Sequence, residues 1–399
     1  MKRGNGFSLL ELMVSLAILL TVAGAAITAL VQAEHVTQGI GLLANTQENL
    51  RAGMNFMVRD LAQAGAGLPQ AGIPIPTNGG ASDLKRPGTG TTAATMTAFP
   101  TTWTTLPLVS PGSQIGQAAT TMNPTTGALL TGVNTDIINV LYADTSTLDA
   151  NAHYLNSFPV VATGSQTCNG TFAANGSSVK IDPNCFTFPT GGPSQFVVGD
   201  LIMFTNANGT ALEYVTGVSN ATQTFTFAAG DPAGLNGTGF TNGTVVGMQN
   251  LSGTPLVPNG TLPTPTIERV YMITYYVDAT TNPQSPQLVR QVNYPVATAS
   301  QPVADAVEDL GFTYDIVSPQ APLASYGTNG PGDAPAPLSP DTPTQIRAVN
   351  VFLAARSETT YNPASSAQFF RNNLTTQVCL RALAFQAPFS TSAGVPPVP

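Results

Sequence analysis

The pattern of apolar and polar positions is most regular near the N-terminus. Glu11 is the only charged residue between Arg3 and Glu34, and apolar side chains dominate the run from Leu12 to Ala33. About 20 such residues are enough to cross a bilayer as a helix. An ionised carboxylate at the bilayer centre costs at least about 2.5–3.5 kcal/mol unless it finds a partner. The pattern therefore predicts a membrane-spanning helix over residues 7–33 in which Glu11 has a specific use.

The helical pattern continues well beyond this apolar run. The first proline is Pro69, and a helix from Phe7 to Ala66 would reach roughly 90 Å at 1.5 Å per residue. Its second half carries a stripe with alternating four- and three-residue steps, which predicts a face packed on the protein's own sheet. The stripe consists of Val36, Ile40, Leu43, Gln47, Leu50, Met54, Met57 and Leu61.

Glycines interrupt this helix and end it. Gly24, Gly39 and Gly41 are candidate positions of bending or melting, and small residues also permit close packing against a helix. The segment Ala64–Pro69 contains two glycines followed by a proline, a pattern that terminates a helix.

The composition changes after the helix. Thr, Gly and Pro dominate residues 67–134, so we expect irregular structure there. Lys85–Gly90 has the glycines of a phosphate loop but lacks the flanking strand and helix, which favours a turn. Trp103, the only tryptophan, is expected to anchor this segment on the core.

Short β-like runs separated by turn signals make up most of the remaining chain. Asn208-Gly209 predicts a hairpin turn, and a Pro- and Gly-rich loop occupies residues 319–343. The expected strands are Ile137–Tyr142, Phe196–Thr205, Leu212–Val218, Thr222–Phe227, Ile267–Asp278, Gln287–Asn293, Leu310–Ile316, Gln345–Ala355 and Phe369–Phe385.

These patterns predict an α+β fold, in which a long N-terminal helix packs on an antiparallel sheet and a large β- and loop-rich insertion enlarges the head. The expected divisions are a leader (1–6), the helix (7–66), an irregular segment (67–134), a turn-rich β region (135–262), the C-terminal sheet of the head (263–385) and a disordered tail (386–399).

The residues around the start of the apolar run resemble a known signal. Lys2 and Arg3 form a short basic leader, followed by Gly6, Phe7 and then Glu11. This order and spacing resemble the N-terminal signal of type IV pilins and pseudopilins, and the resemblance implies a pilin-like fold. It also implies that prepilin peptidase cleaves between Gly6 and Phe7 and that the new amine of Phe7 is methylated. Glu11 would then neutralise the N-terminal amine of a neighbouring subunit during assembly, in a low dielectric.

Three other interpretations of the N-terminus compete with this one. An ordinary secretory signal could end at Val31-Gln32-Ala33, but the apolar run is too long and carries a carboxylate. A plain single-pass anchor gives Glu11 no use. The third interpretation places Glu11 among lipid headgroups without a partner, and it is compatible with the pilin resemblance before assembly.

Further segments resemble, in order, those of minor pilins of the PilW type. They are Val58–Gly65, Val198–Ile202, Leu288–Arg290, Val307–Tyr314, Ile346–Val349 and Thr375–Arg381. The resemblance implies a minor type IV pilin that lies at or near the pilus tip and primes assembly. Its implied partners are the major pilin and other minor pilins, with a tip adhesin as a further candidate.

The resemblance also implies a location. Before assembly the protein would span the inner membrane once, with a cytoplasmic N-terminus and a periplasmic head, and it would then enter the extracellular pilus. A minor pseudopilin of a type II secretion system is the alternative, although the large head favours the pilus. A surface adhesin anchored by an uncut helix is a second alternative, which predicts that Met1 survives in the mature protein.

The charge balance limits the possible partners. Charged residues make up 9% of the chain, far below the usual quarter, and small polar residues supply the polarity instead. This composition is typical of an extracytoplasmic β-rich surface. The net charge of -8 disfavours a phosphate-binding face, so nucleic acid is not an expected partner.

No catalytic constellation emerges from the sequence. A zinc-binding helix, a Cys-x-x-Cys pair, a nucleophile elbow and a phosphate loop are all missing from the sequence. His35 is expected at the membrane surface and His153 in a polar loop. Asp136, Asp144 and Asp149 do not match the spacing of an EF-hand, and solvated loop acids are the favoured interpretation. We therefore expect no enzyme activity, no cofactor and no bound metal.

The three cysteines indicate one disulfide. In an oxidising compartment, Cys168 and Cys185 are expected to pair and to close a short loop worth about 3 kcal/mol. Cys379 lies in a strand-like run and is expected to behave as a small buried hydrophobe. With three cysteines, other pairings stay open.

Overall fold

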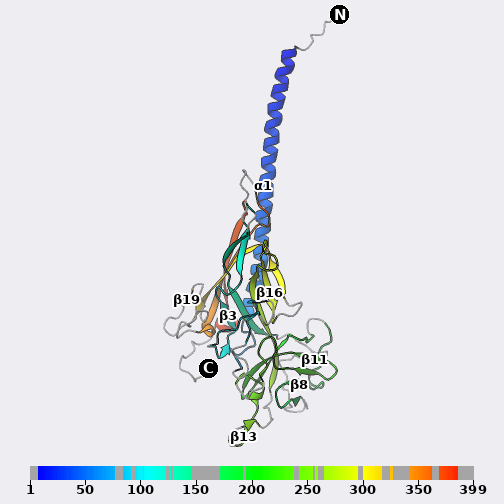
Figure 1. Ribbon diagram of the computed structural model, residues 1–399, viewed down its shortest axis with the longest axis vertical. Coiled ribbons are helices and arrows are strands. Elements are labelled where there is room, and N and C mark those ends of the chain that lie inside the picture. Colours follow the sequence, from blue (N-terminus) through cyan, green and yellow to red (C-terminus); the bar gives the residue numbers. More distant parts are fainter. Residues whose placement is uncertain are drawn as a thin grey trace.

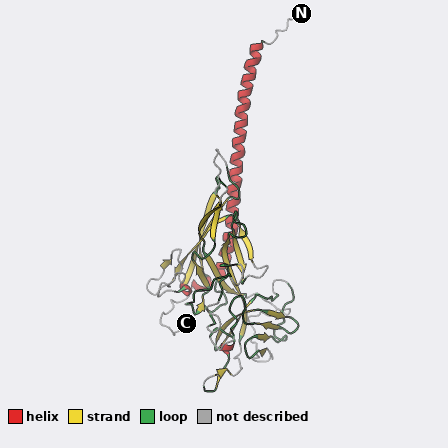
Figure 2. Ribbon diagram, in the orientation of Figure 1, coloured by secondary structure: helices red, strands yellow, loops and turns green. Residues whose placement is uncertain are grey.

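The computed structural model describes residues 8–76, 84–90, 95–101, 103–122, 126, 129–144, 171–191, 195–237, 242–254, 257–258, 265–294, 300–316, 324–326, 342–361 and 368–384. Within these residues, one long helix projects from a head built mainly of strands (Figure 1). Figure 2 shows that this helix dominates the helical structure and that the strands gather at its far end. The arrangement confirms the expected α+β fold with a long N-terminal helix.

The helix α1 (Leu9–Gln63) contains 55 residues and is therefore about 80 Å long. Its N-terminal half extends away from the head, whereas its C-terminal half lies along it (Figure 1). The helix ends close to the predicted place. Gly65 and Gly67 there adopt φ values of 78° and 73°, which glycine tolerates because it has no Cβ.

A seven-stranded antiparallel sheet forms the centre of the head. Its main path runs in the order β10 (Gly209–Tyr214), β9 (Leu201–Asn206), β15 (Thr266–Asp278), β16 (Gln287–Val292) and β17 (Ser300–Ala304). β6 (Ile137–Ala143) pairs with the middle of β15, and β3 (Val109–Gly112) pairs with β6. The long strand β15 thus ties together parts of the chain that are far apart in sequence.

A second antiparallel sheet flanks the helix on its other side. It has the order β19 (Ala324–Tyr326), β18 (Val307–Ile316), β20 (Ile346–Arg356) and β21 (Arg371–Cys379). The helix packs against β21 and β20 of this sheet and against β17 at the edge of the first sheet. The C-terminal half of α1 therefore lies where the two sheets meet, and its apolar side chains join both sheets in one core.

A third sheet belongs to a smaller module at the end of the head opposite the N-terminus (Figure 1). Its order is β11 (Gly217–Ser219), β12 (Thr224–Thr226), β8 (Ser178–Lys180) and β7 (Thr171–Phe172). Phe186, Phe188, Phe196 and Phe225 form its own core, with ring centroids of the last two 4.9 Å apart. Ile202 and Phe204 of β9 enter this second core, whereas Leu201 and Met203 enter the first, so β9 is buried on both faces.

Short elements complete the described chain. Three two-stranded sheets pair β1 (Ile73–Pro74) with β2 (Thr105–Leu106), β4 (Ala118–Met122) with β5 (Leu129–Asn134), and β13 (Leu251–Ser252) with β14 (Val257–Pro258). Two 3-10 turns, η3 (Val246–Met248) and η4 (Pro343–Gln345), and the single-turn helix α2 (Arg381–Ala384) are also present.

The segment 67–134 differs from the expected irregular structure. It contains five of the strands named above, and β3 is an integral part of the main sheet. The predicted turn at Lys85–Gly90 is present, and its Arg86 is buried. Arg86 donates from Nε to Asn139 Oδ1 (2.8 Å) and from Nη2 to the carbonyl oxygen of Ser110 (2.9 Å). Trp103 packs on the core as expected.

The strand predictions were right in position more often than in length. β6, β15, β16, β18 and β20 lie where the β-like runs placed them. The run Phe196–Thr205 was too long, because the chain becomes a strand only at Leu201. In front of β9, Asp200 accepts hydrogen bonds from the backbone of Val197 and from Arg269. The hairpin at Asn208-Gly209 is present, with Gly209 opposite Asn206.

Candidate assembly helix and its anchor on the head

The N-terminal half of α1 has no covering within the described part of the chain. Its most apolar window has a mean hydropathy of 2.4 and is 0% buried. Leu9, Leu16 and Leu30 are 77%, 56% and 70% exposed. An apolar helix of this kind is unfavourable in water, so a membrane or other apolar helices must cover it. By length and composition this helix could cross a membrane.

Glu11 lies in the first turn of this helix. It is the acidic residue of that turn and is exposed. Ser8 occupies the N-cap position with extended backbone angles but makes no side-chain cap bond. A negative charge here is favoured by the helix dipole, and the exposed carboxylate is open to a cation from outside the subunit. Gly6 and Phe7 lie outside the described residues, so the cleavage site and the role of Glu11 stay predictions.

The face of α1 that meets the head differs from the predicted stripe. Val36, Ile40 and Leu43 are 56%, 63% and 38% exposed. The buried residues of this region are instead Gly39, Thr46, Leu50, Gly53, Met54, Met57, Asp60 and Leu61. At 100° per residue, the first part of the predicted stripe is rotated by roughly 60° from the buried face. The prediction was therefore right only from Leu50 onward.

Small residues explain this rotation. A Cβ at Gly39 would come within 3.2 Å of the Tyr361 ring, and one at Gly53 within 3.0 Å of Leu288 and 3.1 Å of Ala304. The helix backbone therefore lies close to the head at these glycines, as one of the two sequence interpretations allowed. A Cβ added at Gly24 or Gly41 would meet nothing within 4 Å, so these two glycines do not serve such packing within the described chain.

A buried ion pair fixes the end of α1 to the main sheet. Asp60 is 1% exposed, and its Oδ2 lies 2.6 Å from Nε of Arg290 on β16. The same oxygen accepts a hydrogen bond of 2.6 Å from the Tyr275 hydroxyl on β15. Burial raises the pKa of Tyr275, and the neighbouring Asp60 charge adds to the effect. Burial lowers the pKa of Arg290, but the hydrogen bond and charge of Asp60 outweigh it and raise that pKa overall.

A second contact holds the middle of the helix. Asn49 Nδ2 donates to the carbonyl oxygen of Asp305 (2.6 Å), and the backbone N–H of Asp305 donates to Asn49 Oδ1 (3.0 Å). Asp305 also accepts a bond of 2.7 Å from Gln287 Nε2. Two polar contacts more than a helical turn apart therefore fix both the rotation and the axial position of α1 on the head.

Charged residues in the segments that resemble minor pilins form pairs in the structure. Asp60 and Arg290 belong to two such segments. Asp200 belongs to a third and lies 2.5 Å from Arg269 Nη2. Glu308 of a fourth lies 2.7 Å from Arg371 Nε. These contacts tie segments of the head and the helix together.

Sequence reasoning missed the basic partners Arg269 and Arg356. Arg269 lies over the Phe196 ring at 5.0 Å, and Arg356 lies over Phe369 at 4.3 Å. Both are buried in strands. The available signal was an arginine within an otherwise mainly apolar strand, in a chain with only 13 basic residues.

The acids considered for calcium are not solvated as expected. Asp136 is buried and accepts hydrogen bonds from the backbone N–H groups of Gln114 and Phe312, both 2.8 Å long. Asp144 accepts a bond of 3.0 Å from the Tyr271 hydroxyl. The oxygens of Asp136 serve the fold because desolvated backbone donors need partners, and Asp144 serves it through the tyrosine hydroxyl. Asp149 lies outside the described residues, and no group of three or more potential metal ligands occurs among those described.

The cysteines and histidines have separate outcomes. Cys379 is free and exposed on β21, so the expectation of a buried residue was wrong; strand β21 lies at a sheet edge and alternates towards solvent. Cys185 is buried, but Cys168 lies outside the described residues, as does His153, and the Cys168–Cys185 pair stays a prediction. His35 is half-buried on α1.

One comparison with known proteins gives a match. Residues 1–27 match the prokaryotic N-terminal methylation motif. The comparison with curated proteins gives no match, and neither does the comparison with solved structures. The motif and the exposed apolar helix together support a type IV pilin-like protein, either a pilin or a pseudopilin, and the motif suggests a structural role.

The motif also carries implications for maturation. It implies processing by prepilin peptidase, methylation and incorporation in a pilus-type filament. The long apolar helix indicates membrane anchoring before assembly.

Proposed function

We propose that this chain is a minor type IV pilin of the PilW type that enters the pilus at or near its tip and primes assembly. The observation that carries the proposal is α1 itself. It places one exposed carboxylate, Glu11, at the start of an uncovered apolar helix whose other half is fixed to a large head. Such a subunit assembles through its helix and makes the contacts that distinguish it from other subunits through its head.

The exposed stripe of the helix supports assembly with other helices. Val36, Ile40 and Leu43 continue the uncovered apolar surface beyond the span expected for the membrane. In a filament, neighbouring helices cover this surface and replace lipid. Cleavage between Gly6 and Phe7 supplies the amine that Glu11 neutralises, because an ion pair is strong in the low dielectric of such a bundle.

Because Asp60 anchors the helix to the head, the position of the helix in the filament sets the position of the head. With Asp60 and Asn49 both bonded to the head, the register of the helices in the filament determines where each head lies. A subunit at the tip presents the end of the head opposite the N-terminus, where the module with β7, β8, β11 and β12 lies (Figure 1). The proposed partners are the major pilin, other minor pilins and a tip adhesin.

Two experiments test the proposal. N-terminal sequencing of the membrane-extracted protein is expected to find methylated Phe7. Glu11→Ala is expected to leave insertion and cleavage intact and to remove the subunit from sheared filaments. Glu11→Gln is the matched control that keeps the side-chain size and removes only the charge, and it is expected to fail in the same way. A mature protein that begins elsewhere, or normal assembly of both variants, contradicts the proposal.

A minor pseudopilin of a type II secretion system is the second candidate, because the methylation motif fits both classes. Deleting the gene separates the two. Loss of pilus fibres with normal protein secretion supports the pilin, and the reverse result supports the pseudopilin. A helix-anchored surface adhesin would retain Met1 and the uncut leader.

A further inference from the structure

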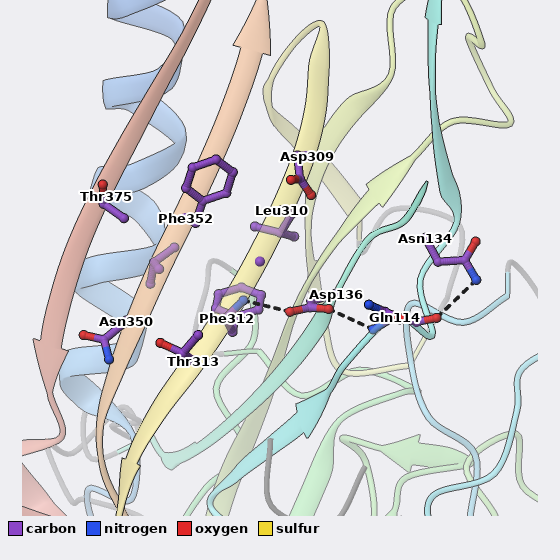
Figure 3. Close-up of a pocket in the computed structure, with 12 residues that line it drawn as sticks. Gln114, Asn134, Asp136, Asp309, Leu310, Phe312, Thr313, Asn350, Phe352 and Thr375 are labelled. Atoms are coloured by element: carbon purple, nitrogen blue, oxygen red, sulfur yellow. Dashed lines mark hydrogen bonds between the residues drawn. The ribbon is translucent and has the colours of Figure 1, made fainter. Parts of the chain in front are cut away.

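A groove lies on the outer face of the second sheet, on the side away from α1. Strands β18, β20 and β21 form its floor, and the residues around Gln114, Asn134 and Asp136 form its wall (Figure 3). Its volume is about 290 Å³. Small-molecule sites start at about 300 Å³, so this groove has room for a ligand of one or two rings.

The floor of the groove is an aromatic ring beside a glycine. Gly311 of β18 lies directly opposite Phe352 of β20, and Phe352 lies opposite Thr375 of β21. A Cβ at Gly311 would meet Phe352 only at 3.9 Å and Asp136 Oδ2 at 4.0 Å. The glycine therefore leaves a hollow next to the half-buried ring that a larger side chain would fill.

The main chain of β18 and β20 in the floor is already bonded. β18 pairs with β20 along the whole groove, and β20 pairs with β21. On the other side of β18, the N–H of Asp136 donates to Leu310 O (2.9 Å) and the N–H of Phe312 donates to Asp136 Oδ2 (2.8 Å). A peptide strand needs a row of open main-chain groups. Recognition at this floor must therefore come from side chains, which disfavours a peptide.

The side chains around the ring are neutral or acidic. Thr375 and Asp309 lie on the two sides of Phe352, and Thr313 and Asn350 lie farther along the same strands (Figure 3). None of the described residues that line the groove is Lys, Arg or His, so the charged groups that an anionic ligand would meet are carboxylates of its own sign. Asp309 is exposed, and burial of part of its carboxyl group raises its pKa against the effect of the Leu310 N–H.

These groups suit a ligand with many hydroxyl groups. A carboxylate accepts two or more O–H bonds, an amide donates and accepts, and a threonine hydroxyl does both. The face of an aromatic ring is an apolar surface with a negative quadrupole, and it attracts weakly polarised C–H groups. A pyranose ring presents C–H groups on its face and hydroxyls around its edge.

We propose that this groove binds a single neutral sugar ring, with the C–H face of the sugar on Phe352 and its hydroxyls bonded to Asp309 and Thr375. The site goes beyond the proposed function, because subunit assembly uses α1 and does not require it. It gives the head a ligand of its own.

Saturation-transfer NMR on the full chain in detergent micelles tests the site. The probes are methyl α-glucoside, methyl β-galactoside, methyl α-mannoside and N-acetylglucosamine. At least one sugar is expected to bind with a Kd of about 1 mM, since the binding free energy available to a ligand of this size is little larger than this Kd requires. Phe352→Leu keeps the apolar volume but removes the flat ring, and it is expected to weaken binding about tenfold.

Gly311→Val fills the hollow and is expected to abolish binding. Gly311→Ala is the milder variant, because its Cβ fits without a clash, and it is expected to weaken binding while folding normally. Asn373→Ala changes an exposed residue of β21 outside the groove and is the matched control with unchanged binding. Thermal unfolding and N-terminal processing are measured for each variant, so that misfolding and failed maturation are recognised.

Four outcomes overturn the proposal. The first is that none of the four sugars binds below about 10 mM. The second is binding that neither Phe352→Leu nor Gly311→Ala changes. The third is stronger binding of sialic acid, an anionic sugar, through the same groove. The fourth is a change in self-association by sedimentation in the Gly311 variants without any sugar binding, which would make the groove a contact between copies of the chain.

Discussion

Removing one side of the Asp60–Arg290 pair is expected to release the end of α1 from the head. Arg290→Met keeps an unbranched side chain and removes the cation. The Asp60 carboxylate, which is 1% exposed, then retains the Tyr275 hydroxyl at 2.6 Å and the more distant Arg59 at 3.5 Å. Loss of one partner of a buried ion pair costs about 3–5 kcal/mol. Because two weaker partners remain, we expect a loss near the lower limit, about 3 kcal/mol.

Urea unfolding of the full chain in detergent measures this loss, with the fluorescence of Trp103 as the signal. Trp103 packs on the same core as the helix, so it reports the unfolding of the head. Hydrogen exchange of residues 46–61 reports the release of the helix directly. We expect the midpoint of unfolding to fall and the exchange of these amides to rise in Arg290→Met.

The double variant Asp60→Asn/Arg290→Met supplies the decisive comparison. It removes both charges and keeps an acceptor for the Tyr275 hydroxyl. Since a buried carboxylate no longer lacks its cation, the double variant is expected to be more stable than the sum of the single changes predicts, by more than about 1 kcal/mol. If Arg290→Met lies within about 0.5 kcal/mol of the parent, or if the two changes simply add, the ion pair is not what holds the helix.

Three further predictions rest on particular residues. Gly53→Ala places a Cβ 3.1 Å from Ala304 Cβ and is expected to lower the free energy of unfolding by about 1–3 kcal/mol. Gly41→Ala, whose Cβ meets nothing within 4 Å, is expected to raise it by about 0.5–1 kcal/mol. Equal effects of the two variants in urea unfolding would contradict the close approach of the head at Gly53. Burial raises the pKa of Glu213 well above its usual value, so the folded state binds this proton more tightly and stability falls as pH rises from the unfolded-state pKa to the folded one. Glu213→Gln is expected to remove that pH-dependent loss and to stabilise the protein at pH 7, and an unchanged pH profile of the melting temperature would refute the assignment. Cys379 is free and exposed, so a maleimide is expected to label it in the folded protein within minutes; labelling that requires denaturant would show that the thiol is covered.

The existence and the end of the N-terminal helix were largely predictable because their information is local. A run of apolar residues without proline, ended by Gly65, Gly67 and Pro69, specifies a helix through interactions between residues a few positions apart. The methylation motif over residues 1–27 is equally local. Strands β15 and β16 were also found from their own β-like residues.

The sequence pattern could not identify the buried face of the helix. The pattern from Val36 to Leu43 reports where apolar side chains lie, and these remain exposed. The head instead approaches Gly39 and Gly53, where the missing Cβ lets Tyr361, Leu288 and Ala304 come close. Close approach depends on the shape of the partner surface, and the periodicity of the helix sequence carries no information about that shape.

By itself the sequence determined a long membrane-compatible helix with one acid near its start, followed by a β-rich head. Only the tertiary structure decided that β3 joins the main sheet, that Asp60 meets Arg290 across 230 positions of chain and that Gly311 lies opposite Phe352 in a groove. The physical reason is the range of the interactions. Helix and strand periodicity come from neighbouring residues, whereas strand order, buried ion pairs and grooves depend on contacts between segments far apart in sequence.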